Sequence, residues 1–218
     1  MQDLNMVQVI AVWALPVLFA ITVHEVAHGW VAKKLGDPTA LMLGRLTLNP
    51  LKHIDLIGTV VVPLALVLMG GFIFGWAKPV PVTWANLKNP KRDMALVAFA
   101  GPASNLVMAF GWALIMKVGF LLGDDFSWLA WPLIYMGGAG IVINGILMLL
   151  NLLPVPPLDG GRVLAGILPG PWAYKLSRVE PYGLMIIVVL MVTGMLGKIL
   201  GPPLRYFEGL LFSLAGVS

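Results

Sequence analysis

Two histidines and a glutamate form the most informative pattern in the chain, His24-Glu25-Val26-Ala27-His28. Residues four apart share one face of a helix, so both imidazoles can bind one zinc ion. The glutamate between them can take a proton from water at the metal. Alternatively, these polar side chains only pack a helix end, although burying all three in a long apolar helix is costly. The spacing predicts a site for one Zn²⁺ ion, with Glu25 as the candidate base.

Two histidines leave such a site incomplete, because catalytic zinc usually has three protein ligands. The remaining candidates are His53, Asp55, Asp159, Glu180 and Glu208. Asp159 is distinctive: it follows an apolar helix, is expected on non-helical backbone, and adjoins glycines that allow close approach to a metal. On its own it could equally cap a helix beginning at Gly160. His53 lies among ordinary loop residues, which favours a place near the ligands or the substrate.

Asn105 is a polar outlier within the apolar run that contains Gly101-Pro102-Ala103-Ser104-Asn105. A buried amide could donate to an oxyanion that develops during catalysis. A hydrogen bond between helices is at least an equal alternative. The same ambiguity holds for Asn144 and Asn151, and Arg162 is expected to anchor at the membrane interface or to pair with a carboxylate.

The composition indicates the class of protein in which these residues lie. The chain has 218 residues, of which 59% are hydrophobic and 11% are charged. A soluble enzyme and a disordered chain are excluded, since soluble domains are about half apolar and a quarter charged. The absence of cysteine excludes disulfides and thiolate metal sites. The net charge of +4 is then expected to mark cytoplasmic loops, not a nucleic-acid partner.

Apolar runs predict an all-α polytopic membrane protein in a lipid bilayer. They cover residues 6–31, 54–76, 94–122, 126–153 and 181–200, and residues 202–218 form an interfacial helix or a sixth span. This gives five to six segments in a single domain, 1–218, with a catalytic core at about 6–168 and C-terminal helices at 181–218. Residues 41–48 could add short membrane-associated strands near the site. Small residues at 137–140 are expected to let neighbouring helices pack closely.

The distribution of basic residues predicts how these runs cross. If His28 and Asp159 bind one ion, the first and fourth runs point the same way across the membrane. Two runs lie between them, so one of these two does not cross the membrane. Bases flank the second run on both sides, namely Lys33, Lys34, Arg45 and Lys52 before it and Lys78, Lys88, Lys91 and Arg92 after it. We therefore expect residues 54–76 to form a re-entrant hairpin, the N-terminus to lie outside, and the site to open to the cytoplasm.

The segment from Lys78 to Thr83 is a candidate edge for binding a substrate by strand addition. Pro79 and Pro81 alternate, so the missing donors lie on one edge, while Val80 and Val82 keep their N–H groups on the other. A proline-stiffened loop is an equal alternative.

Three motifs together resemble the site-2 protease family of intramembrane zinc metalloproteases. They are HEVAH, GPASN and NLLPVPPLDGG, and the match spans about residues 23–162. Residues 49–55 and 75–82 look like its compact prokaryotic branch, and no segment is long enough for the PDZ or CBS domain of other members. The resemblance implies that His24, His28 and Asp159 bind zinc, that Glu25 is the general base and that Asn105 assists. It also implies regulated intramembrane proteolysis of transmembrane-helix substrates in a prokaryotic cell membrane.

Two other functions compete with this interpretation. A metal transporter could also place His and Glu in membrane spans, but it would need further ligands along a pathway, and the chain has three histidines. A catalytically silent, chaperone-like relative would have no use for Glu25 beside the ligands.

Overall fold

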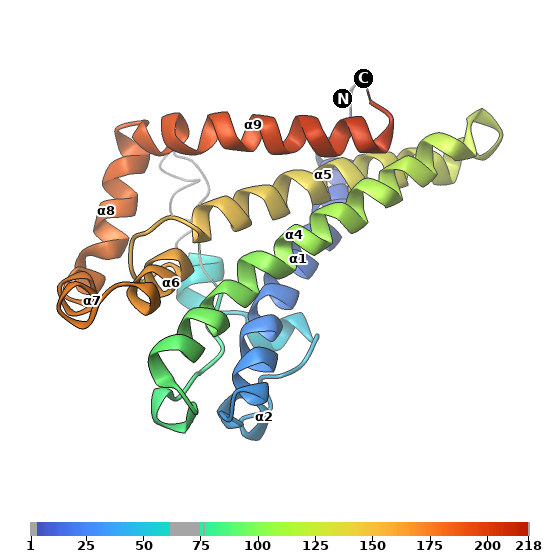
Figure 1. Ribbon diagram of the computed structural model, residues 1–218. Helices are drawn as coiled ribbons and strands as arrows, with labels where there is room; N and C mark the ends of the chain where they lie inside the picture. The colour runs from blue at the N-terminus through green and yellow to red at the C-terminus, as the bar shows by residue number, and fades with distance from the viewer. Residues whose placement is uncertain (1–3, 62–74, 76, 218) are drawn as a thin grey trace.

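The computed structural model describes residues 4–61, 75 and 77–217, and these residues form helices without strands (Figure 1). Three helices are long and apolar enough to cross a membrane: α1 (Met6–Lys34), α4 (Pro90–Leu122) and α5 (Ser127–Asn151). A bent pair, α8 (Glu180–Val192) and α9 (Met195–Ala215), would make a fourth span if counted as one. The all-helical class is confirmed, but the expected five to six segments reduce to three or four among these residues.

Short helices connect the long ones. They are α2 (Thr39–Met42), η1 (Pro50–His53), η2 (Leu56–Val61), η3 (Trp84–Asn86), η4 (Asp124–Phe126), α6 (Asp159–Ile167) and α7 (Gly170–Ser177). The chain runs down α1, back along α4 and down again along α5, so α1 and α5 point the same way, as expected (Figure 1). This arrangement brings the last turns of α1 close to the start of α6, which follows α5.

Small residues let α4 and α5 approach closely, as the sequence predicts. A Cβ atom added at Gly140 would lie 2.1 Å from the Trp112 ring, and one at Gly137 would lie 2.6 Å from Met116. The same two helices meet α9 in a buried apolar cluster that includes Leu211 and Ala215. Glycine is therefore required along α5 to bring these helices together.

The strands expected at residues 41–48 do not form. Residues 39–42 are the helix α2, and the next backbone groups are satisfied locally, since Gly44 donates to the Leu41 carbonyl and Arg45 to the Ala40 carbonyl. Gly44 then turns the chain with φ 63°. Local helix and turn hydrogen bonds thus satisfy the backbone, and the described residues contain no strand with which this stretch could pair.

The C-terminal boundaries also differ from the sequence prediction. The run at 181–200 is interrupted by Gly194, which has φ 71°, and α8 and α9 meet there at 81°. Helix α9 then continues through Pro202 and Pro203. Most of the predicted hairpin at 54–76 lies outside the described residues, so that prediction stays open.

Candidate metal centre and active site

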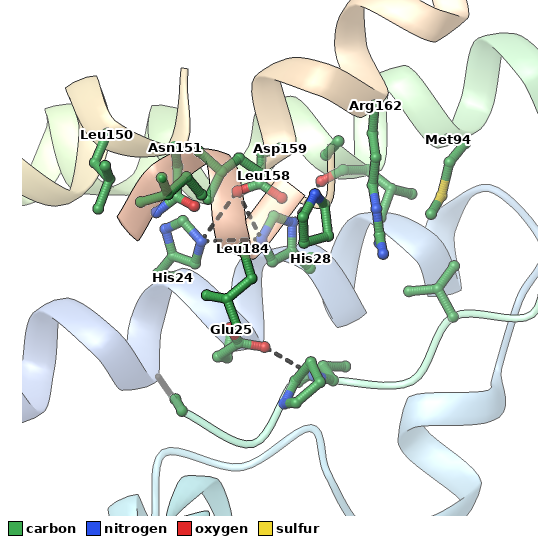
Figure 2. Close-up of a pocket in the computed structure, with 18 residues that line it drawn as sticks. His24, Glu25, His28, Met94, Leu150, Asn151, Leu158, Asp159, Arg162 and Leu184 are labelled. Atoms are coloured by element: carbon green, nitrogen blue, oxygen red, sulfur yellow. Dashed lines mark hydrogen bonds and ion pairs between the residues drawn. The ribbon is translucent and has the colours of Figure 1, made fainter. Parts of the chain in front are cut away.

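A cavity of about 400 Å³ lies between the C-terminal part of α1, residues 77–82 and the junction of α5 with α6 (Figure 2). Its lining includes His24, Glu25 and His28 from α1 and Asp159 from the first turn of α6. Side chains far apart in the sequence therefore share one cavity, as the motif analysis predicts.

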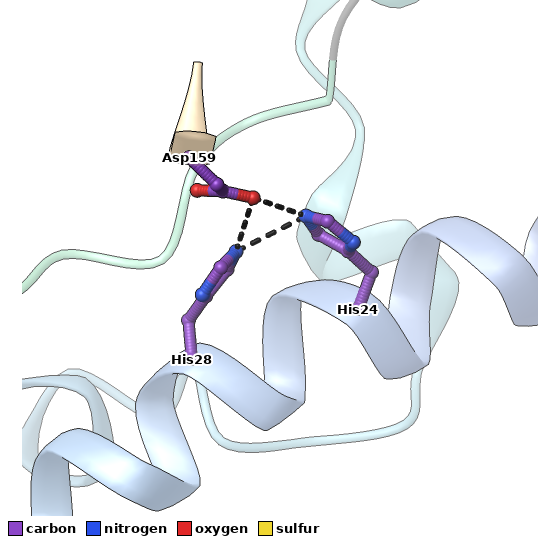
Figure 3. A group of neighbouring side chains, drawn as sticks. All are labelled: His24, His28 and Asp159. Carbon is purple, nitrogen blue, oxygen red and sulfur yellow. Dashed lines mark hydrogen bonds and ion pairs between the residues drawn. The ribbon is translucent and has the colours of Figure 1, made fainter. Parts of the chain in front are cut away.

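Three of these side chains converge on one point (Figure 3). The Nε2 atoms of His24 and His28 are 3.1 Å apart, and they lie 3.2 and 3.3 Å from Oδ2 of Asp159. All three residues are buried. Among the described residues, they are the one group of this kind that could hold a metal ion.

The other ring nitrogens contact α4, which fixes the orientation of both imidazoles. His24 Nδ1 lies 2.6 Å from Oδ1 of Asn105, and His28 Nδ1 lies 2.7 Å from the Val97 carbonyl oxygen. Because both partners are acceptors, each Nδ1 carries the hydrogen and donates it. The lone pair of each Nε2 is then directed at the point where the two rings meet Asp159.

Asn105 does not have the geometry expected of an oxyanion donor. It is completely buried, and its amide nitrogen donates to the carbonyl of Ala20 and to Oδ1 of Asn144. Both amide hydrogens are therefore committed, and its oxygen accepts from His24. The alternative reading, a hydrogen bond between helices, describes Asn105 better, and that bond holds one of the candidate ligands.

Gly101 lets α4 lie directly against the two imidazoles. A Cβ atom there would lie 2.5 Å from Cε1 and Nε2 of His28 and 2.6 Å from Cε1 of His24. This glycine lies in the motif at residues 101–105, but no role was predicted for it from the sequence. The missing signal was spacing, because Val97, Gly101 and Asn105 follow one another at four-residue steps and share one face of α4.

Asp159 is the first residue of α6 and is not its cap. Leu158 occupies the N-cap position without a side-chain hydrogen bond, so the carboxylate is free to point at the histidines. Cβ atoms at Gly160 and Gly161 would lie 2.3 Å from backbone atoms of Leu152 and Pro156. The glycines therefore pack this turn against the chain that follows α5, whereas the sequence analysis expected non-helical backbone at Asp159.

The donor set fits a zinc ion. Zinc bonds of about 2.0–2.1 Å in a tetrahedron place neighbouring ligand atoms about 3.3 Å apart, close to the 3.1–3.3 Å observed. Oδ2 of Asp159 is buried without a hydrogen-bond partner, as expected of an atom that faces a cation. Burial would raise the pKa of Asp159, but when His24 and His28 are protonated, their hydrogen bonds and positive charge lower it to about 2, which keeps the carboxylate ionised.

Glu25 lines the same cavity but points to the opposite chain segment (Figure 2). Its Oε2 accepts a hydrogen bond of 2.7 Å from the backbone N–H of Val80. Residues 77–83 have no regular secondary structure, so they form no strand. The Val80 N–H, expected to be available to a substrate, is engaged by Glu25.

The remaining polar candidates lie around this centre. His53 is buried outside the cavity lining, with Nε2 bonded to the Thr47 carbonyl, so its ring holds a loop. Arg162 lines the cavity and lies 3.8 Å from Glu180, the kind of carboxylate pairing that the sequence suggested. Asp37 is a buried carboxylate that follows α1 and accepts a hydrogen bond from the 78–83 segment, a role that was not predicted from the sequence.

Comparison with known proteins places this chain in a family. The chain is 39% identical to the Bacillus subtilis (strain 168) protein named "Putative zinc metalloprotease YwhC" over 198 residues, which cover 86% of this chain and 83% of the relative. It is 31% identical over 215 residues to "Putative zinc metalloprotease Rip2" of Mycolicibacterium smegmatis, covering 96% and 74% of the two chains. The chain belongs to the site-2 protease family.

Rip2 of Mycobacterium tuberculosis (strain H37Rv) is a further relative in this family, with 30% identity over 220 residues that cover 97% of this chain and 75% of Rip2. No family model matches the chain, and no solved structure matches it significantly. The site-2 protease assignment therefore rests on relatives that align over most of both chains.

Proposed function

We propose that this site-2 protease family member is an intramembrane zinc metalloprotease that hydrolyses peptide bonds in or near transmembrane helices. One observation carries the proposal: Nε2 of His24, Nε2 of His28 and Oδ2 of Asp159 lie 3.1–3.3 Å apart in the cavity that Glu25 lines. The spacing suits a tetrahedral zinc site, and the names of the relatives agree with it.

Each residue has a distinct role in this proposal. His24, His28 and Asp159 hold the ion, which when bound supplies the Lewis acidity that activates water and stabilises negative charge. Glu25 takes a proton from the attacking water and delivers it to the leaving amine nitrogen. Asn105 acts through His24: by accepting the Nδ1 hydrogen, it keeps the ring in the tautomer and orientation that a metal requires.

A membrane substrate follows from where the site lies. The histidines are on α1, a helix long and apolar enough to span a bilayer. We therefore propose that a neighbouring transmembrane helix reaches the cavity from within the bilayer. A helical substrate must unwind to expose its carbonyl, and an extended partner can hold it open. In the 78–83 segment, the Val80 N–H is bonded to Glu25, whereas the Val82 N–H has no partner among the described residues. Strand addition is therefore proposed to use Val82.

The basic residues near the site favour an opening to the cytoplasm, and the bacterial relatives favour a prokaryotic cell membrane. Lys33 and Lys34 lie in the last turn of α1, just beyond His28, and Arg45 and Lys52 follow. By the positive-inside rule this end of α1 faces the cytoplasm. Water can then reach the cavity from that side.

Incubating the purified protein with a panel of single-span membrane proteins tests this function. We expect cleavage that stops with a zinc chelator and returns with added zinc, at sites that mass spectrometry places in or near the transmembrane helix. Glu25→Ala is the matched control and should keep zinc without cutting. Cleavage that survives complete zinc removal, or that equals wild type in Glu25→Ala, would refute the proposal.

A metal transporter is the competing function, and one observation weighs against it. A transport pathway needs successive ligand groups, whereas one group of three is found among the described residues. Zinc uptake into proteoliposomes without proteolysis of the panel would favour the transporter.

A further inference from the structure

The segment that covers Glu25 is held in place by side chains outside the cavity. Buried Arg45 donates from Nη2 to the Lys78 carbonyl at 2.8 Å, and the N–H of Lys78 donates to the His53 carbonyl. At the other end, the N–H of Thr83 donates to Oδ2 of Asp37 at 2.6 Å. Residues 78–83 have no regular secondary structure, so these contacts take the place of a sheet or a helix in fixing the backbone.

Asp37 is arranged to accept several donors at once. It is completely buried and follows α1 directly. Its Oδ1 accepts from the Thr39 N–H at 3.0 Å, from the Thr39 hydroxyl and from the Asn86 amide at 2.9 Å, while Oδ2 accepts from Thr83. Three donors therefore converge on Oδ1 and one on Oδ2, and an ionised carboxylate, which only accepts, suits such a set of donors. Oδ1 therefore binds residues of α2 and η3, and Oδ2 binds the 78–83 segment.

The middle of the segment touches the proposed base. The N–H of Val80 donates to Oε2 of Glu25. A Cβ atom added at Gly29 would lie only 2.9 Å from Cγ1 of Val80. Val80 is thereby packed against α1, one turn after Glu25. A glutamate side chain has several rotatable bonds, so a fixed donor on one oxygen restricts where the other can lie.

We infer that Asp37 and Arg45 are positioning residues of this enzyme: they clamp the 78–83 segment so that the Val80 N–H orients the Glu25 carboxylate. This inference rests on the proposed role of Glu25 as the general base. Neither Asp37 nor Arg45 lines the cavity, so neither touches substrate or metal, and both act through the backbone of the segment. The clamp acts on kcat and leaves zinc binding unchanged.

Asp37→Asn tests the clamp with minimal change. Its remaining oxygen can keep the contacts with Thr39 and Asn86, while its NH₂ group replaces the acceptor of the Thr83 N–H. Asp93→Asn is the matched control, because Asp93 is also a buried carboxylate that accepts one backbone N–H, from Asn89 at the start of α4. Any general cost of neutralising a buried carboxylate appears in both variants.

Two measurements are made on detergent-purified protein. Hydrogen exchange by mass spectrometry follows residues 78–83, which contain four backbone N–H groups because two residues are proline. Asp37→Asn should speed exchange of this segment about tenfold or more. With a panel substrate that the wild type cuts, kcat at saturating substrate should fall about 10- to 100-fold with unchanged zinc content. A rise in KM would report the substrate contact proposed at Val82, whereas the fall in kcat reports the orientation of Glu25. Asp93→Asn should change neither the exchange nor kcat.

The outcomes separate the clamp from the proposed function. If Asp37→Asn leaves the exchange of the segment or kcat at the wild-type value, the clamp is wrong. If it fails to fold, Arg45→Met tests the other end and must show both changes. If the wild type cuts nothing in the panel, the proposed function fails, and the exchange experiment still decides whether Asp37 holds the segment.

Discussion

Gly101→Ala is the substitution that most directly tests how the candidate metal centre is built. The added Cβ atom would lie 2.5 Å from Cε1 and Nε2 of His28 and 2.6 Å from Cε1 of His24. Ordinary contacts of a Cβ atom begin at about 3.4 Å, so either the rings or α4 must shift by roughly 0.9 Å. Nε2 is one of the atoms expected to bind the ion, and the clash therefore falls on the ligand itself.

A shift of this size is large for a metal site. Ligand distances must stay within about 0.2 Å of their ideal values. Moving α4 away would also lengthen the bonds from His24 to Asn105 and from His28 to Val97, and the loss of such partners costs about 10- to 100-fold in metal affinity. We expect zinc affinity in Gly101→Ala to fall at least this much, and cleavage with it.

The assay is competition for zinc with a chelator of known affinity on the purified variant. Gly111→Ala is the matched control, because Gly111 lies on the same helix with no atom within 4 Å of an added Cβ. Alanine is favoured over glycine inside a helix by about 1 kcal/mol, so the control should keep zinc and be at least as stable as the wild type. Wild-type zinc affinity in Gly101→Ala would refute the reasoning; equal loss in both variants would assign the effect to α4 as a whole.

Other substitutions and a pH change give further expected outcomes. Glu25→Ala should retain zinc and lose cleavage by at least about 10²-fold, measured by zinc content and product mass. Asp159→Ala should lose zinc at neutral pH, because two histidines alone do not complete the site; full zinc occupancy would contradict its assignment as a ligand. Asn105→Ala should lower zinc affinity about 10- to 100-fold, and an unchanged affinity would exclude its positioning role. Burial would raise the pKa of Asp37, but hydrogen bonds from Thr39, Asn86 and Thr83 lower it below its ordinary value. Its contribution to the free energy of unfolding should therefore be full above about pH 4 and decline as pH falls toward the folded pKa, a decline absent from Asp37→Asn.

The helices and the convergence of three side chains could be predicted from the sequence because they depend on local spacing. A four-residue step places His24 and His28 on one face whatever surrounds them. The length and polarity of the apolar runs similarly predict α1, α4 and α5 within a few residues. The break at Gly194 could not be placed, because the run around it is mostly apolar and the positive φ appears only in the fold.

Features that depend on contacts between distant segments were not predictable in detail. Asn105 was correctly singled out as a buried amide, but the sequence does not say which of its atoms faces which neighbour. The role of Asp37 was missed, because its partners Thr83 and Asn86 are more than forty positions away. Short strands were predicted as possible at residues 41–48, whereas local helix and turn hydrogen bonds satisfy the backbone at the start of this stretch.

The contact between α1 and α4 explains why the two motifs occur together. His24 and His28 are one turn apart on α1, and Asn105, Gly101 and Val97 are one turn apart on α4. The helices run in opposite directions, so the earlier histidine meets the later residue: His24 contacts Asn105, His28 contacts Val97, and both rings lie over Gly101. A slip of one turn between the helices would set each ring against the wrong neighbour. The glycine-proline-alanine-serine-asparagine motif is thus the counterpart of the histidine motif: Gly101 gives the rings space, and Asn105 fixes the tautomer of one of them.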